Sequence, residues 1–149
     1  MIVGWRLDEE ISDEFLQMLD SVCRKDARIV AAFMGKYQNY EESIKKYPLL
    51  AANSRCLGAQ EDALAVTECM DLYVNPKRNG GGSSVAEALY KGLPAVTLPV
   101  GDVSAAAGES FRVADYGEMA ETILHFASDE DYYERMSRLA EERAEQLMD

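Results

Sequence analysis

The chain has 149 residues, 48% of them hydrophobic, and its 27 acidic against 15 basic residues give a formal net charge of −12. A chain of this length can form one ordinary domain that buries its own core. The negative charge would repel a polyphosphate backbone over the whole surface, which argues against binding DNA or RNA. Any phosphate ligand must therefore be held by a local site.

The sequence carries no signal for secretion, membrane insertion or metal binding. Its first residues lack a basic region followed by a long apolar core, and no apolar run is long enough to cross a bilayer. Cys23, Cys56 and Cys69 are far apart and have no histidines at metal-ligand spacing, so we interpret them as reduced packing residues. We therefore predict a cytoplasmic chain with no transmembrane segment, no metal site and no cofactor.

Short apolar runs alternate with amphipathic stretches along the chain. The runs that are expected to form strands are Met1–Val3, Ala27–Phe33, Arg55–Leu57, Asp71–Val74 and Leu93–Leu98. The alternation predicts an α/β fold in which helices cover both faces of a parallel sheet. Because no repeat or linker divides the sequence, residues 1–149 are expected to form a single domain.

The stretches between these runs show helical periodicity. Helices are expected from Ser12 or Asp13, over Glu41–Lys46, over Gln60–Met70, from Ser83 or Ser84, after Asp115, and from Ser128. Pro48 is expected to end the second of these helices, and Asp115 with Glu118 forms a capping signature. Leu64, Ala65 and Cys69 share one apolar side of the third. The last helix is long, with an acidic and solvated outer face.

The most informative segment lies between the last two predicted strands. Three consecutive glycines, residues 80–82, are followed by Ser83 and Ser84, where a helix is expected to begin. The first turn of a helix has unpaired N–H groups, and glycines let a ligand approach them without a Cβ in the way. A flexible surface turn is the commoner role of a glycine run, but the two hydroxyls and the flanking strands favour a site for a phosphate-like group.

Glu87 lies three residues beyond Ser84, about one turn into the same helix. By residue type alone it would be a solvated helix residue, but a carboxylate at this offset can accept hydrogen bonds from a ribose. The loop lacks the Gly-Lys-Ser/Thr ending of a P-loop, and no Gly-x-Gly-x-x-Gly follows the first strand. The pattern therefore favours a nucleoside diphosphate over a triphosphate or a dinucleotide.

These motifs resemble the nucleotide-sugar half of GT-B glycosyltransferases. The matching residues are Asn75-Pro76, the Gly-Gly-Ser-Ser of residues 81–84, the Glu-Ala-Leu of residues 87–89, the Gly-Leu-Pro of residues 92–94, and Val96-Thr97. The resemblance extends from Gly4 to about Met148. It implies a Rossmann-like, three-layer α/β/α domain with a parallel sheet and a long C-terminal helix, which is one half of a GT-B fold.

The resemblance also implies roles for individual residues. Gly81, Gly82, Ser83 and Ser84 would lie at the pyrophosphate of the donor, and Glu87 at its ribose. Gly4 with Arg6-Leu7 is similar to a family element whose arginine meets the donor phosphates, although a surface ion pair explains Arg6 equally well.

Three further positions near these motifs are less informative. Lys77 and Arg78 are weaker phosphate candidates, since loop cations more often serve solubility. Asn79 stands where many retaining members of the family have a second glutamate, so the stereochemical outcome stays open.

The resemblance implies a donor-binding domain for a nucleotide sugar of the UDP or GDP type. In that family the active site lies between two domains, and the N-terminal acceptor domain is not represented in residues 1–149. We therefore expect the chain alone to be inactive, and no catalytic residue is assigned. The small residues Gly101–Gly108, beyond the last strand, are a second candidate wall of the site.

Two alternatives remain at the level of sequence. A nucleotide-sugar 2-epimerase relative would share the fold but act on the donor itself. A receiver-type regulatory module would fit the size and acidity, but it needs acidic residues clustered after its first strands, where this chain has Arg6 and Asp8. His125, next to Phe126 near the end of a predicted helix, is not expected to be a site residue.

Overall fold

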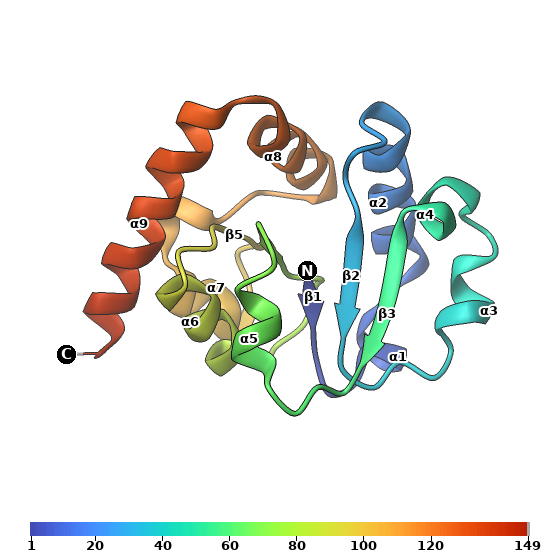
Figure 1. The fold of residues 1–149 in the computed structure, drawn as a ribbon, viewed down its shortest axis with the longest axis horizontal. Coiled ribbons are helices and arrows are strands. Elements are labelled where there is room, and N and C mark those ends of the chain that lie inside the picture. The colour runs from blue at the N-terminus through green and yellow to red at the C-terminus, as the bar shows by residue number, and fades with distance from the viewer. Residues whose placement is uncertain (149) are drawn as a thin grey trace.

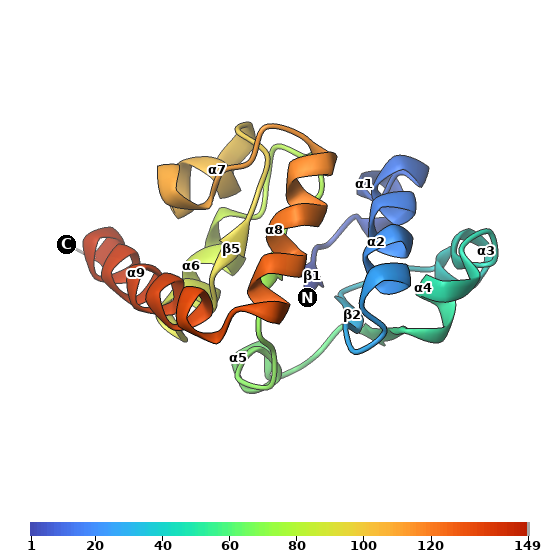
Figure 2. The same ribbon diagram turned by 90° about the horizontal axis from the view of Figure 1, so that it is seen from above.

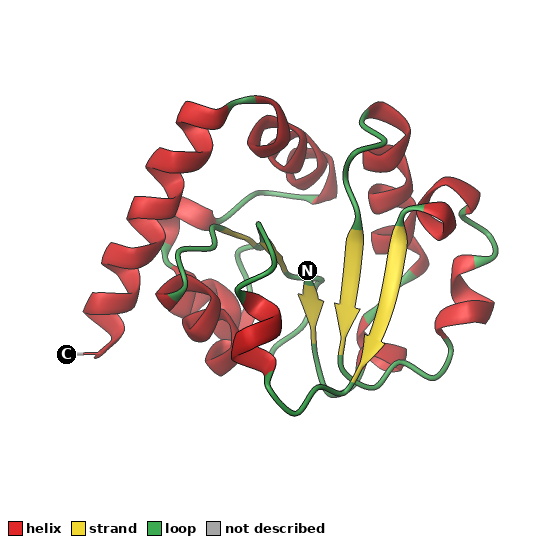
Figure 3. Cartoon of the chain, in the orientation of Figure 1, coloured by secondary structure: helices red, strands yellow, loops and turns green. Residues whose placement is uncertain are grey.

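The computed structural model describes residues 1–148, in which short strands alternate with helices (Figures 1 and 3). The strands are β1 (Ile2–Val3), β2 (Ala31–Met34), β3 (Ser54–Gly58), β4 (Tyr73–Val74) and β5 (Ala95–Val96). The helices are α1 (Leu7–Glu10), α2 (Asp13–Lys25), α3 (Tyr40–Ile44), α4 (Pro48–Ala52), α5 (Ala63–Thr67), α6 (Gly82–Tyr90), α7 (Gly101–Ala107), α8 (Tyr116–Ser128) and α9 (Glu130–Met148), with a 3₁₀ turn at Glu109–Phe111. This order confirms the predicted α/β alternation.

The strands are parallel and run in the order β3, β2, β1, β4, β5. β1, β2 and β3 form one ladder and β4 and β5 another. The Val74 N–H donates to the Met1 carbonyl oxygen at 2.8 Å and so connects β4 to β1. An isolated parallel bridge between Thr97 and Arg112 extends the pairing beyond β5. Because all strands point the same way, their carboxyl ends meet along one edge.

Helices cover both faces of the sheet, as the sequence predicted. α2 packs against α4 and α8 on one face, while α6 packs against α7 and α9 on the other. Figure 2 shows β5 between α8 and α6, and both of these helices contact it. Phe15, Phe33, Tyr73, Val85, Val96 and Met119 are among the fully buried side chains that fill the space between the layers.

Two of the predicted helix starts are confirmed by their capping hydrogen bonds. The Ser12 Oγ accepts from the Phe15 N–H at 3.1 Å, directly before α2. The Asp115 Oδ1 accepts from the Glu118 N–H at 2.8 Å, directly before α8. Such caps satisfy N–H groups that the helix itself leaves unpaired, which is why the signal is readable locally.

Three helix predictions were wrong in detail. Pro48 does not end a helix but begins α4, at the position where its lack of an N–H costs nothing. α5 is shorter than Gln60–Met70, because the Asp62 carboxylate caps it through the Ala65 N–H at 3.0 Å. Its predicted apolar side is the exposed one, with Leu64 41% exposed.

The last helix begins at Glu130, not at Ser128, because Asp129 caps it through the Tyr132 N–H at 3.0 Å.

Two other regions also differ from what their sequence predicted. Residues 101–107 form the helix α7, because alanine favours helix even without an amphipathic pattern. The strand expected from Ala27 begins only at Ala31, because Asp26 holds the preceding turn by accepting hydrogen bonds from the Arg28 N–H and guanidinium.

The cysteines are free, as predicted, but only one of them is a packing residue. Cys23 is buried, whereas Cys56 and Cys69 are exposed. Burial, assisted by the nearby Asp20 carboxylate, raises the pKa of the Cys23 thiol to about 11.

Within residues 1–148, no helix is both long enough and apolar enough to cross a bilayer. The cytoplasmic location therefore stays a prediction from the sequence.

The contact between the ends of β1 and β2 leads to a test of the fold. Gly35 has a φ of +125°, and a Cβ there would overlap the Gly4 carbonyl oxygen. Gly35→Ala should therefore lower the free energy of unfolding by about 2 kcal/mol or more. Gly80→Ala is the matched control, since nothing lies within 4 Å of a Cβ at that position. Urea denaturation curves of equal midpoint for the two variants would show that the chain at Gly35 tolerates a side chain after all.

Candidate functional site

The predicted site lies where the strand order reverses. From the central pair β1 and β4, the chain continues to β2 on one side and to β5 on the other. The segments that leave these two strands therefore diverge and open a crevice at the carboxyl edge, which is where open α/β sheets bind ligands. Gly4 follows β1 there, and residues 75–81 follow β4.

The glycine run ends in an open helix start. Gly81 has a φ of +100° and stands before the first residue of α6, and no side chain caps the helix. The Val85 N–H donates to the Gly81 carbonyl oxygen at 3.2 Å, but within residues 1–148 the N–H groups of Gly82, Ser83 and Ser84 have no hydrogen-bond partner. Three such donors at the positive end of a helix dipole are suited to an anion, and we call them the anion cradle.

Five of the six predicted site residues thus lie together, on the first two turns of α6 and just before it. Ser83 and Glu87 are exposed, one turn apart on the same helix. The Ser84 Oγ lies 2.9 Å from the Gly81 carbonyl oxygen and 2.6 Å from the Tyr73 hydroxyl, so it has hydrogen-bond partners within the protein. Its only proton is therefore used within the protein, and Ser84 can offer a ligand its backbone N–H alone.

Arg6 is the sixth predicted residue and is turned to solvent. Its side chain is 77% exposed, and its Nη1 lies 3.9 Å from a carboxylate oxygen of Glu9. Its carbonyl oxygen accepts from the N–H groups of Glu9 and Glu10 at the start of α1. The geometry matches the ion pair that the sequence offered as an alternative, and a phosphate contact by Arg6 stays a prediction.

Arg78 is buried, which overturns its interpretation as a solvated loop residue. Only 4% of its side chain is exposed. Its Nε donates to the Asn75 Oδ1 at 2.7 Å, its Nη1 to the Glu10 Oε1 at 3.1 Å, and its Nη2 to the Tyr73 hydroxyl at 3.0 Å. The guanidinium thus joins β4, the loop after it, and α1. Lys77, in contrast, is exposed as expected.

Glycines allow the chain to close around this arginine. A Cβ on Gly4 would lie 2.6 Å from the Arg78 Nη1, and one on Gly81 would lie 3.0 Å from its Nη2. On the other side, a Cβ on Gly101 would overlap the Arg78 carbonyl oxygen, and the Asp102 N–H donates to the Asn79 carbonyl oxygen at 2.7 Å. The start of α7 therefore packs on the loop, where the second wall was predicted.

Sequence reasoning missed the pairing of Arg78 with Tyr73 and Glu10. Tyr73 carried a readable signal, since a tyrosine inside a buried strand must find a partner for its hydroxyl. Burial raises the pKa of Tyr73, so its hydroxyl keeps its proton and can donate. Arg78 carried no such signal, because its carboxylate partner Glu10 lies 68 residues away in the chain.

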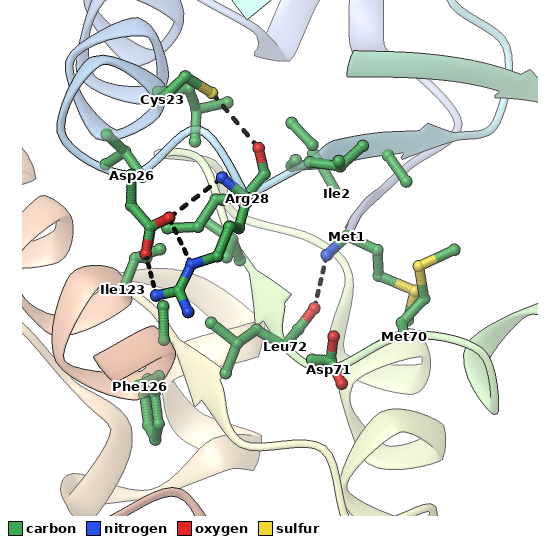
Figure 4. Close-up of a pocket in the computed structure, with 18 of the residues that line it drawn as sticks. Met1, Ile2, Cys23, Asp26, Arg28, Met70, Asp71, Leu72, Ile123 and Phe126 are labelled. Atoms are coloured by element: carbon green, nitrogen blue, oxygen red, sulfur yellow. Dashed lines mark hydrogen bonds and ion pairs between the residues drawn. The ribbon is translucent and has the colours of Figure 1, made fainter. Parts of the chain in front are cut away.

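A large cavity, of about 850 Å³, lies at the opposite edge of the sheet (Figure 4). It is lined by the start of β1, the ends of α2 and α8, and the segment before β4, including Met1, Cys23, Arg28, Leu72 and Phe126. None of the predicted site residues lines it. Because ligands of such sheets bind at the carboxyl ends of the strands, we place the candidate site at α6 and not in this cavity. Within residues 1–148, no group of acidic, histidine or cysteine side chains is arranged to hold a metal ion.

The fold is that of a Rossmann-like α/β domain. Residues 2–129 match the family model described as glycosyl transferases group 1. The chain belongs to this family, which confirms the resemblance seen in the sequence and argues against a receiver-type module. No sequence among the curated proteins matches the chain.

Solved glycosyltransferase structures share the fold. S. aureus TarM, as a G117R mutant in complex with fondaparinux, alpha-GlcNAc-glycerol and UDP, has a TM-score of 0.79 at 18% identity over 95% of this chain. Anabaena HepE in complex with UDP has a TM-score of 0.75 at 17% identity over 97% of this chain. WaaG, a glycosyltransferase involved in lipopolysaccharide biosynthesis, has a TM-score of 0.75 at 16% identity over 97% of this chain. The chain spans 31%, 44% and 42% of these three proteins, respectively.

The buried position of Arg78 leads to a stability prediction. Arg78→Met should cost about 3 kcal/mol in the free energy of unfolding, because it leaves the Glu10 carboxylate and two further polar groups without their donor. The matched control is Arg28→Met, since the Arg28 side chain is 76% exposed beside Asp26 and should matter far less. Chemical denaturation of both variants measures the difference. Similar losses for the two would show that the Arg78 contacts do not stabilise the fold.

Proposed function

We propose that this chain is the donor-binding domain of a glycosyltransferase and that it binds a nucleoside-diphosphate sugar of the UDP or GDP type. One observation carries the proposal: three N–H groups at the start of α6 have no partner within residues 1–148 and lie at the carboxyl edge of the sheet. A diphosphate is the ligand that best matches adjacent N–H donors at the positive end of a helix dipole.

In the proposed site, each part of α6 contacts a different part of the donor. The N–H groups of Gly82, Ser83 and Ser84 donate to the diphosphate oxygens, with about 0.3–2 kcal/mol added by the helix dipole. The Ser83 hydroxyl, which is exposed, adds one donor. Glu87 lies one turn further and accepts from the ribose hydroxyls. The presence of UDP in the TarM and HepE structures supports this kind of ligand.

The chain is proposed to be one half of the enzyme. It covers less than half of the length of the solved structures that it resembles. In the proposed enzyme, an acceptor domain faces the carboxyl edge of the sheet and completes the active site. Turnover by the isolated chain is therefore expected to be negligible, and the acceptor and the sugar are left to experiment. Loss of the nucleotide sugar without an acceptor, by the complete enzyme, would favour the 2-epimerase alternative instead.

The first test is thermal stabilisation of the chain by nucleoside diphosphates. At a hundred times its Kd, the correct nucleotide should stabilise the chain by about 2.7 kcal/mol and raise its melting temperature. UDP, GDP, ADP and dTDP are compared, and free uridine is the control, since it lacks the diphosphate that the helix start would bind. A flat response to all four diphosphates would refute the proposed function.

The second test concerns the ribose. Glu87→Ala should weaken the binding of the stabilising nucleoside diphosphate about tenfold or more, since hydrogen bonds to a charged acceptor are lost. Inorganic pyrophosphate should bind this variant and the parent equally. Glu121→Ala is the control, because Glu121 is an exposed helix residue on α8. If Glu87→Ala weakens pyrophosphate as much as the nucleotide, Glu87 does not contact the ribose.

A further inference from the structure

A continuous chain of hydrogen bonds connects α1 to the start of α6. It begins at the Glu10 carboxylate, which accepts from the Arg78 Nη1 at 3.1 Å. The Arg78 Nη2 donates to the Tyr73 hydroxyl at 3.0 Å, and that hydroxyl lies 2.6 Å from the Ser84 Oγ. The Ser84 hydroxyl in turn donates to the Gly81 carbonyl oxygen at 2.9 Å. We call these five residues the relay.

One hydrogen bond of the relay has a fixed direction. A guanidinium can only donate, so the Tyr73 oxygen must accept from Arg78. Between Tyr73 and Ser84 either hydroxyl can be the donor, because the Gly81 carbonyl oxygen lies 2.9 Å from the Ser84 Oγ and 3.5 Å from the Tyr73 hydroxyl. In both arrangements every hydroxyl of the relay has a partner, and within residues 1–148 no buried side-chain polar atom is left without one. A fully satisfied buried network of this kind specifies a single conformation of the chain.

The relay ends on the residue that sets the direction of the anion cradle. The Gly81 carbonyl accepts both the Ser84 hydroxyl and the Val85 N–H, which is the first hydrogen bond of α6. The peptide plane that holds this carbonyl also holds the N–H of Gly82, so fixing one fixes the other. Glycines at positions 80–82 would otherwise leave this turn free to adopt many conformations.

We propose that Tyr73 and Arg78 are positioning residues, which hold the first turn of α6 in the orientation that presents its free N–H groups to the diphosphate of the donor. The inference rests on the proposed function. In this proposal neither residue contacts the donor itself, because Tyr73 is fully buried and only 4% of the Arg78 side chain is exposed, with each of its three nitrogens donating to Asn75, Glu10 or Tyr73. Their effect on affinity is preorganisation, which lowers the entropy that binding would otherwise cost.

Tyr73→Phe is the test, since it removes one hydroxyl from the middle of the relay and keeps the buried ring. The Kd of the full chain for the nucleoside diphosphate that stabilises the parent should rise about fivefold or more, as expected for one lost buried hydrogen bond. The Kd of inorganic pyrophosphate should rise by a similar factor, because the diphosphate contacts are the ones disturbed. Both are measured by calorimetry at a temperature where the variant is fully folded.

Tyr47→Phe is the matched control. The Tyr47 hydroxyl donates to the Asp13 carboxylate at 3.0 Å and makes no hydrogen bond to a member of the relay, so its loss removes a tyrosine hydroxyl bond without touching the relay. This variant should bind as the parent does. Hydrogen exchange of both variants is also measured without ligand. The Val85 amide hydrogen should exchange with solvent faster in Tyr73→Phe than in Tyr47→Phe, because the first turn of α6 is held less firmly in Tyr73→Phe.

The outcomes separate this inference from the function on which it rests. If the parent chain binds no nucleoside diphosphate, the proposed function fails. If the parent binds but Tyr73→Phe binds equally well, the inference alone is overturned. A lower melting temperature of Tyr73→Phe with unchanged Kd values would also overturn it, since it would show a purely structural role.

Discussion

A single buried cation organises the carboxyl edge of this domain. Burying a guanidinium is unfavourable unless its donors are satisfied, and Arg78 meets this requirement through acceptors on three separate segments. Asn75 lies in the loop after β4, Tyr73 within β4, and Glu10 on α1. Each acceptor must stay near its present position, so the two sides of the crevice are held together by one side chain.

The arginine also explains where the chain needs glycine. The backbone approaches the guanidinium closely at Gly4 and Gly81, and the start of α7 approaches the Arg78 carbonyl at Gly101. These three glycines are therefore packing requirements of the loop. Gly80 is different, since no atom lies within 4 Å of a Cβ there, and a Cβ at Gly82 would meet only Asp102, whose Cβ would be 3.3 Å away. The glycine run thus has two physical roles: Gly81 makes room for the buried Arg78, and Gly80 and Gly82 leave space beside the chain. The sequence suggested only that glycines let a ligand approach.

Local signals predicted a large part of the fold and little of the internal structure of the site. The capping residues Ser12 and Asp115 were readable because cap and helix are adjacent in the chain, and the strand pattern predicted the parallel sheet. The clustering of residues 81–87 followed from helix geometry alone. The partner of Arg78 could not be inferred, because a contact between residues 10 and 78 exists only after the sheet has formed. The hydrogen bond between the Ser84 and Tyr73 hydroxyls likewise joins residues that are 11 positions apart in the chain.

The source of positive potential in the proposed site follows from these contacts. Arg6 is exposed beside Glu9, and the Arg78 charge is partly offset by Glu10, in a chain whose net charge is −12. In the proposed site, the exposed Lys77 and the backbone N–H groups are the remaining sources of attraction for a diphosphate, and hydrogen bonds from such N–H groups to a charged group contribute about 1.5–3 kcal/mol each, against about 0–1 kcal/mol for an exposed ion pair. Such donors bind well only when their directions are fixed in advance. The rigidity of the loop around Arg78 is therefore part of the proposed binding chemistry, because it holds these N–H groups in place before the ligand arrives.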